Sequence, residues 1–232
     1  MKRFYAEVDT VSTDRGWIVQ LDGRPIKTQG GRLQTVSTGR LAELLAGEWR
    51  AQGDQIDPAT FRFRDMADYA IDVVAKDTEA VVDKLLGYAE TDTLCYRADP
   101  EDALFRRQQD VWEPLLTATE AREGVRFQRV SGIIHRAQPA ETLARLRRRL
   151  EAMDPFLLAA LEQLVSLSAS LCIGLGAIET PSSGKQFWDA ANLEEDWQAD
   201  LWGKDEEAAV RREKRMTDFL EALRFAEAAR VP

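Results

Sequence analysis

Apolar and polar positions alternate with a period of two in the first part of the chain. The alternation runs along residues 17–21 and is typical of a strand. Asp22-Gly23 follows at once and predicts a two-residue hairpin turn, because glycine tolerates positive φ. The chain then returns through residues 24–28, turns again at Gly30-Gly31, and alternates once more over residues 33–36. We therefore expect a small antiparallel, turn-rich sheet.

After Ser37 the apolar spacing becomes helical. Ser37 or Thr38 is a suitable N-cap, and Gly53 is a plausible end for a helix near residues 38–52. Its apolar side chains fall on one side: Leu41, Leu44, Leu45 and Trp49. Because Trp49 ends this apolar row, we expect it to be structural and to hold the β-rich part of the chain against the helical part.

Beyond residue 60 the pattern is almost entirely helical, apart from short extended segments expected at residues 61–63 and 127–130. The apolar run after Asp154-Pro155 predicts one buried helix that reaches about Ile178. Pro114 is expected to kink or interrupt its helix. The other helices are expected to begin at Asp77, near Asp102 and after Gln138-Pro139, with two more around residues 193–202 and 205–229.

Together these patterns predict an α+β protein. A small antiparallel β-rich N-terminal domain is expected over residues 1–60, including the helix near 38–52. A larger all-helical C-terminal domain is expected over residues 61–232. A chain of 232 residues can bury enough surface to fold without a disulfide or a structural metal.

Charge and hydropathy narrow the function. The net charge is −9, from 31 basic and 40 acidic residues, which argues against nucleic acid as a partner because phosphate backbones need a basic surface. The N-terminus has no apolar signal region, and the longest uncharged stretch, residues 163–178, is shorter than the roughly 20 residues that span a bilayer. We expect a protein of the cytosol or an organelle matrix with no membrane insertion.

The candidate catalytic inventory is small. His135 is the one histidine, and the two cysteines, Cys95 and Cys172, lie far apart in sequence, so no Cys/His metal site is expected. His135 itself is expected to have a local structural or solvent-facing role. Ser183-Gly184-Lys185 lacks the leading glycine and the preceding strand of a phosphate loop. We expect no catalytic residue, no cofactor and no metal.

An acidic segment near the C-terminus is more informative. Between Asp189 and Glu207 the chain has eight acids and one lysine, Lys204, interleaved with Trp197 and Trp202. Such a segment is a solvated helix face, a carboxylate pair for acid-base chemistry or a hard cation, or a recognition surface. Composition leaves these alternatives open.

Several motifs along nearly the whole chain resemble the Atp12 family, which comprises assembly chaperones for the F1 part of ATP synthase. They are residues 21–28 (LDGRPIKT), Glu48-Trp49, residues 91–97 (TDTLCYR), residues 109–116 (QDVWEPLL), Gly132-Ile133 with Gln138-Pro139, residues 193–198 (LEEDWQ) and residues 202–208 (WGKDEEA). The motifs occur in the family's order.

The resemblance implies a β-rich domain joined to a helical domain, and no catalysis. It also implies binding of the unassembled α subunit of F1, whose β-facing surface the chaperone shields until the β subunit arrives. Such a protein is expected in the bacterial cytoplasm, or in the mitochondrial matrix as a processed eukaryotic form. The alternatives are a non-catalytic adaptor or scaffold, and a hydrolase that uses a carboxylate pair such as Glu195 and Asp205.

Candidate site residues follow from the acidic C-terminal motif. Glu195 is the first candidate for partner binding, and its structural alternative is capping or pairing within the helical domain. Trp49 and Trp112 are expected to be structural. The remaining partner-binding candidates are Glu194, Trp197, Gln198, Trp202, Asp205 and Glu206.

Overall fold

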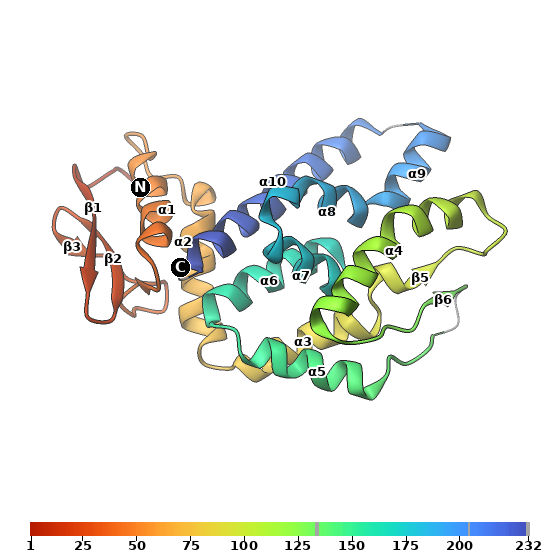
Figure 1. The fold of residues 1–232 in the computed structure, drawn as a ribbon. Helices are drawn as coiled ribbons and strands as arrows, with labels where there is room; N and C mark the ends of the chain where they lie inside the picture. The colour runs from red at the N-terminus through yellow and green to blue at the C-terminus, as the bar shows by residue number, and fades with distance from the viewer. Residues whose placement is uncertain (133–134, 204, 231–232) are drawn as a thin grey trace. The chain divides into compact units, whose positions relative to one another are not determined.

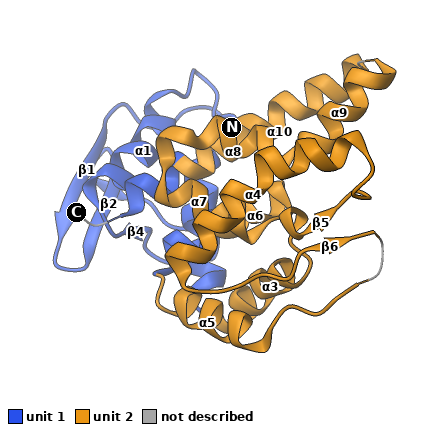
Figure 2. Cartoon of the chain, turned by 45° about the vertical axis from the view of Figure 1, so that its right-hand side comes forward, with its two compact units in different colours: residues 1–78, 154–160, 224–232 blue, residues 79–153, 161–223 orange. Residues whose placement is uncertain are grey.

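The computed structural model describes residues 1–132, 135–203 and 205–230. The chain forms two compact units (Figure 2). Unit 1 comprises residues 1–78, 154–160 and 224–232, and unit 2 comprises residues 79–153 and 161–223. The division into domains at residue 60 remains a prediction. Ile133 and Lys204 of the quoted motifs lie outside the described residues.

The sheet of unit 1 is antiparallel, with strand order β1-β2-β3 and β4 also paired to β2 (Figure 1). The predicted hairpin turn is confirmed, since Asp22 and Gly23 both have positive φ, 48° and 75°, as a type I′ turn requires. The strands are β1 (Val8–Thr13), β2 (Gly16–Leu21), β3 (Arg24–Pro25) and β4 (Thr35–Val36).

Helix α1 (Gly39–Arg50) packs against β1 and β2. Its N-cap is Thr38, whose Oγ1 accepts a hydrogen bond from the Leu41 N–H at 3.1 Å, so the predicted start is confirmed. The same Thr38 hydroxyl donates to the Ala228 carbonyl at 2.5 Å. This bond ties α1 to the end of the chain within unit 1.

Residues 61–63 are not the extended segment that their sequence predicted. A 3₁₀ turn, η1 (Pro58–Thr60), leads directly into α2 (Arg62–Tyr69), which continues as the π-helical η2 (Ala70–Val74). The Glu48 carboxylate accepts hydrogen bonds from the Phe63 and Arg64 N–H groups at 2.7 and 2.8 Å. This distant acid satisfies first-turn donors that would otherwise be unpaired, and so allows the helix to begin here.

The larger region is helical, which confirms the predicted fold class of a small N-terminal antiparallel sheet followed by a helical C-terminal region. It also carries a short parallel pair, β5 (Tyr96–Arg97) with β6 (Val130–Ser131). No helix in the described ranges is both long and apolar enough to cross a membrane. The elements are α3 (Thr78–Glu90), η3 (Thr93–Cys95), α4 (Ala103–Glu123), α5 (Ala140–Glu151), α6 (Pro155–Ser168), α7 (Leu171–Glu179), η4 (Pro181–Ser183), α8 (Gly184–Ala191), α9 (Leu193–Trp202) and α10 (Glu206–Ala229).

The prediction of one helix from Pro155 to Ile178 is wrong, because the chain breaks between α6 and α7. Ala169 has a φ of 51°, and the Ser170 hydroxyl caps α7 by accepting from the Ile173 N–H at 3.0 Å. Both helices are apolar, so hydropathy does not reveal the break. A Cβ added at Gly174 would lie 2.6 Å from Val165 Cγ2, so this glycine allows α7 to approach α6.

Pro114 was expected to kink or interrupt its helix, and an interruption is absent, since α4 is continuous through this residue. A proline inside a helix removes one N–H and leaves the carbonyl four residues earlier without its usual donor. Pro114 and Asp110 are both exposed, so water can satisfy the Asp110 carbonyl. The helix predicted after Gln138-Pro139 is confirmed by the start of α5, and the N-cap predicted at Asp154 is confirmed by the start of α6.

Candidate functional site

The acidic motif forms helix α9, and two of its acids are used to hold the helix in unit 2. Glu194 Oε1 accepts a hydrogen bond from Gln108 Nε2 of α4 at 2.6 Å. Asp196 forms a two-pronged ion pair with Arg212 of α10, with Nη2 and Oδ2 2.7 Å apart. These two contacts orient α9 against its neighbours.

Glu195 and Gln198 differ from those two acids. Both side chains are exposed, and neither forms a hydrogen bond or an ion pair with any residue in the described part of the chain. Trp197 is half-buried. The arrangement therefore leaves the Glu195 carboxylate and the Gln198 amide directed to solvent.

The end of α9 and the start of α10 expose a concentration of apolar side chains. Trp202 is 86% exposed, Leu201 64% and Val210 71%. Among the described residues seven large apolar side chains are exposed, and these three lie within ten positions of each other. An exposed apolar cluster with a polar rim is typical of a protein interaction surface. Leu201 and Val210 were not predicted, because sequence alone does not show which face of a helix lacks a neighbour.

Asp205 and Glu206 lie at the start of α10. Asp205 Oδ1 accepts a hydrogen bond from the Glu207 N–H at 2.9 Å, and Glu206 is in the first turn. Negative charge in this place stabilises a helix start, where the backbone dipoles are positive. Asp205 thus caps the start of α10, a structural role that the alternative of a hydrolase with a Glu195–Asp205 carboxylate pair does not call for.

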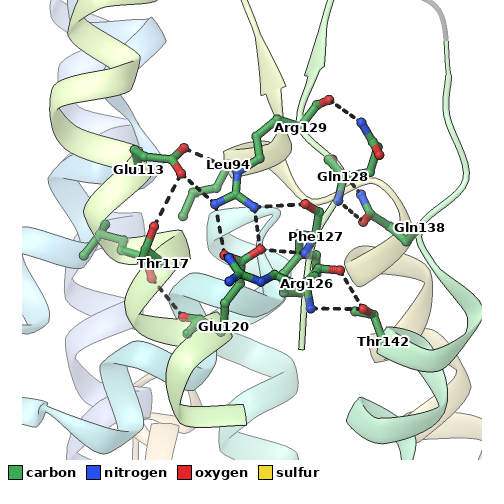
Figure 3. A network of polar contacts seen from close by, with 12 residues as sticks. Leu94, Glu113, Thr117, Glu120, Arg126, Phe127, Gln128, Arg129, Gln138 and Thr142 are labelled. Carbon is green, nitrogen blue, oxygen red and sulfur yellow. Dashed lines mark hydrogen bonds and ion pairs between the residues drawn. The ribbon is translucent and has the colours of Figure 1, made fainter. Parts of the chain in front are cut away.

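A partly buried network of charged side chains fixes α4 to the segments around β5 and β6 (Figure 3). Arg129 lies between two glutamates of α4 and donates from Nη2 to Glu113 at 2.6 Å and to Glu120 at 3.1 Å. Glu120 is 3% exposed and also accepts from the Phe127 N–H at 2.7 Å. The segment from residue 126 to 131 is therefore held to α4 by ionic contacts.

Arg97 completes this network from the other strand. Its side chain is buried and donates to the Leu94 carbonyl at 2.8 Å, to Glu113 at 3.0 Å and to Gln109. The neighbouring Gln108 accepts from the Ala98 N–H at 2.8 Å while it donates to Glu194. The network is thus continuous with the contact that positions α9.

At the centre of the network two guanidinium groups, of Arg97 and Arg129, face the two carboxylates of Glu113 and Glu120, and the exposed Arg126 adds a third guanidinium beside Glu120. Burial alone would raise the pKa of Glu120, but its hydrogen bonds from Arg129 and Phe127 lower the pKa below the ordinary value. The hydrogen bond from Arg129 likewise lowers the pKa of Glu113. Both glutamates are therefore ionised at neutral pH and suited to stabilising structure rather than to exchanging protons.

Sequence reasoning did not single out the acids and arginines of this network. The available signal was that Arg97, Gln109 and Glu113 all stand within the family motifs. Side chains brought together from distant segments cannot be paired from one sequence.

The two tryptophans expected to be structural are both buried. Trp112 is fully buried, and its Nε1 donates to the Ala190 carbonyl at 2.8 Å, which links α4 to α8. Trp49 packs within unit 1 against Tyr5 and Phe61, with ring centroids 5.6 and 4.5 Å apart. Both ring contacts of Trp49 lie inside unit 1.

The remaining reactive side chains have local roles. Asp92 is fully buried and accepts from Ser170 Oγ at 2.7 Å and from the Cys172 N–H at 2.9 Å. Burial raises the pKa of both thiols, Cys95 and Cys172, which disfavours the reactive thiolate. His135 is exposed and hydrogen-bonds through Nδ1 to the Tyr96 hydroxyl at 2.9 Å. In the described ranges no three or more His, Cys, Asp or Glu side chains are placed to hold a metal ion.

Comparison with known proteins relates the chain to a family of chaperones. The family model described as ATP12 chaperone protein matches residues 2–120. Mitochondrial protein atp12 of Schizosaccharomyces pombe is 27% identical over 219 residues, which cover 89% of this chain and 75% of that protein.

Solved structures are also similar over almost the whole chain. Atp12 from Paracoccus denitrificans and a point mutant of it each have a TM-score of 0.94 and 34% identity, covering 99% of this chain and 98% of theirs. A protein from Agrobacterium tumefaciens has a TM-score of 0.93 and 37% identity, covering 99% of this chain and 86% of its own.

Proposed function

The chain belongs to the ATP12 chaperone family, which supports a role in ATP synthase assembly, and from that premise we propose that it binds the unassembled α subunit of F1. In this proposal the chaperone shields the β-facing surface of α until the β subunit takes its place. The observation that carries the proposal is the exposed apolar and acidic end of the α9–α10 pair. The mechanism uses no catalytic step and no cofactor.

The proposed contact surface has an apolar centre and a polar edge. Trp202, Leu201 and Val210 expose apolar surface to water, and burying this surface against a partner would be favourable. Tryptophan is also among the residues that most often contribute a large share of the binding energy at an interface. Glu195 supplies a carboxylate without an internal partner among the described residues. The proposed surface is completed by Glu194, Trp197, Gln198, Asp205 and Glu206.

The direct test compares two forms of the partner. Immobilised protein is incubated with free α subunit and, separately, with assembled F1, and retained material is quantified. The proposal requires retention of free α and exclusion of assembled F1, because the β subunit occupies the same surface of α. Equal retention of both forms would refute the handover mechanism.

A second assay separates chaperoning from simple attachment. Aggregation of isolated α subunit is followed by light scattering with and without this protein. A chaperone suppresses the aggregation of α and has no effect on an unrelated aggregating protein. An adaptor or scaffold would bind α without suppressing its aggregation.

Charge reversal at Glu195 tests the residue assignment. Breaking one side of a desolvated charge contact typically costs about 2–5 kcal/mol of binding, so Glu195→Lys should abolish protection of α. Asp200→Lys is the matched control, since Asp200 is exposed on the same helix and a rim charge mainly changes the association rate. Normal protection by Glu195→Lys, or loss of its circular dichroism signal and melting transition, would show that the assigned residue is wrong.

The location follows from the partner. We propose that the protein acts in the bacterial cytoplasm, or in the mitochondrial matrix if it is a processed eukaryotic form, because free α subunits occur in those compartments. Fractionation followed by immunoblotting tests this, and recovery with the membrane after a salt wash would contradict it.

A further inference from the structure

One concavity of unit 2 has a lining made only of charged residues. It has a volume of about 590 Å³ and lies where the end of α4, one face of α5 and the end of α7 come together. Its lining consists of Arg122, Glu123, Arg145, Arg148, Arg149 and Glu179. Four guanidinium groups therefore surround this space with two carboxylates.

Both carboxylates are already paired with arginine. Glu179 Oε1 lies 3.0 Å from Arg149 Nη2. Glu123 lies between two arginines, with Oε1 3.0 Å from Arg122 Nε and Oε2 3.6 Å from Arg149 Nε. Two arginines account for the charge of the two glutamates.

The other two arginines have no acidic partner among the described residues. Arg145 donates from Nε to the Glu123 carbonyl at 2.6 Å. Its guanidinium lies over Gly124, where an added Cβ would be 2.7 Å from Nη2. Arg148 is exposed and makes no hydrogen bond or ion pair with a described residue.

This leaves an excess of two positive charges in a chain whose net charge is −9. Arg145, Arg148 and Arg149 are spaced i, i+3 and i+4, so they share one face of α5, where like charges repel. A bound anion would remove this repulsion. No apolar side chain lines the space, so the concavity offers no apolar surface to a hydrocarbon.

We propose that this concavity binds a multiply charged oxyanion of the phosphate class, with pyrophosphate as the smallest good ligand. Guanidinium groups present paired N–H donors that match phosphate oxygens, and such charge-assisted bonds are the strong ones. Arg148 and Arg145 would make the main contacts, and the paired Arg122 and Arg149 would form the wall. None of these residues belongs to the proposed α-subunit surface, so the two proposals stand or fall separately.

Isothermal titration calorimetry at constant ionic strength and without divalent cations tests the site. The probes are orthophosphate, pyrophosphate, tripolyphosphate and ATP. Affinity should increase from orthophosphate to tripolyphosphate. ATP should bind with the same affinity as tripolyphosphate if the site recognises the phosphates alone. A lower affinity for ATP would show that the ligand is a free polyphosphate rather than a nucleotide. Failure of the wild-type protein to bind either pyrophosphate or tripolyphosphate would overturn the proposal.

Arg148→Glu should weaken pyrophosphate binding about tenfold or more, since it removes a charge-assisted contact and adds repulsion. Arg106→Glu is the matched control, because Arg106 is exposed on α4 and lies outside the lining of the concavity. The affinity of this control variant for pyrophosphate should stay within about threefold of the wild-type value. Arg148→Gln removes the positive charge without reversing it, so its affinity for pyrophosphate is measured as well. Circular dichroism verifies that all variants are folded. Equal losses in the Arg148 and Arg106 variants would show a general effect of net charge and refute the site.

Discussion

Replacement of Glu120 by glutamine tests whether the partly buried ionic network stabilises unit 2. Glu120 is 3% exposed, and its carboxylate accepts from Arg129, from Arg126 and from the Phe127 N–H. The amide of glutamine has nearly the same size, so the substitution removes the charge and creates no cavity. Both carboxylate oxygens accept hydrogen bonds, so the effect also includes the loss of one acceptor oxygen, which the amide NH2 group replaces with a donor.

The expected magnitude follows from what the other residues retain. Removal of one partner of a buried pair costs about 3–5 kcal/mol when the other charge is left alone. Here Arg129 keeps its ion pair with Glu113, the amide oxygen still accepts from Phe127, and Arg126 is 85% exposed. We therefore expect the lower end, about 3 kcal/mol of unfolding free energy, which lowers the melting temperature by roughly 6–12 °C for a chain of this size.

The measurement is urea unfolding followed by circular dichroism, with Asp110→Asn as the control because Asp110 is an exposed acid on the same helix. The urea concentration at the midpoint of unfolding should fall for Glu120→Gln, while the dependence of the unfolding free energy on urea stays unchanged. For the control variant the midpoint should remain at the wild-type value. The pKa of Glu120 is lowered in the folded protein. Its contribution is thus complete above the ordinary glutamate pKa and is lost as the pH falls through the folded value. A loss below about 1 kcal/mol, or a difference that grows on acidification, would refute this reasoning.

Two further predictions concern the cores of the units. Trp49→Ala should cost about 3–5 kcal/mol, the range for deleting a large buried aromatic side chain, and is measured as a lower urea midpoint; an unchanged melting temperature with loss of α binding would instead make Trp49 a contact residue. Cys95 and Cys172 are buried with raised pKa values, so neither should react with a thiol reagent at pH 8 until urea unfolds the protein. Rapid native-state labelling of either thiol would contradict the burial described here.

Local features of the sequence were sufficient to predict much of the fold. The Asp22-Gly23 turn depends only on backbone preferences of two adjacent residues, and it is present as predicted. The helix starts after Thr38 and Asp154 depend on a side chain that bonds to an N–H two or three positions later. The apolar period of two or of 3.6 residues located most strands and helices, since one face of each is buried.

The tertiary structure decided what depends on partners distant in sequence. Glu48 starts α2 from fifteen positions away. The Ser170 hydroxyl, which caps α7 where an apolar run looks continuous in sequence, itself donates to Asp92, 78 positions away. Trp112 is buried, whereas Trp202 is 86% exposed, although the residue type is the same. A side chain's hydropathy is a property of the residue, but its exposure and its ionic partners depend on which other segments pack beside it. For that reason the acidic motif could be recognised in the sequence, while only the folded chain distinguishes Glu194, held by Gln108, from Glu195, which faces solvent.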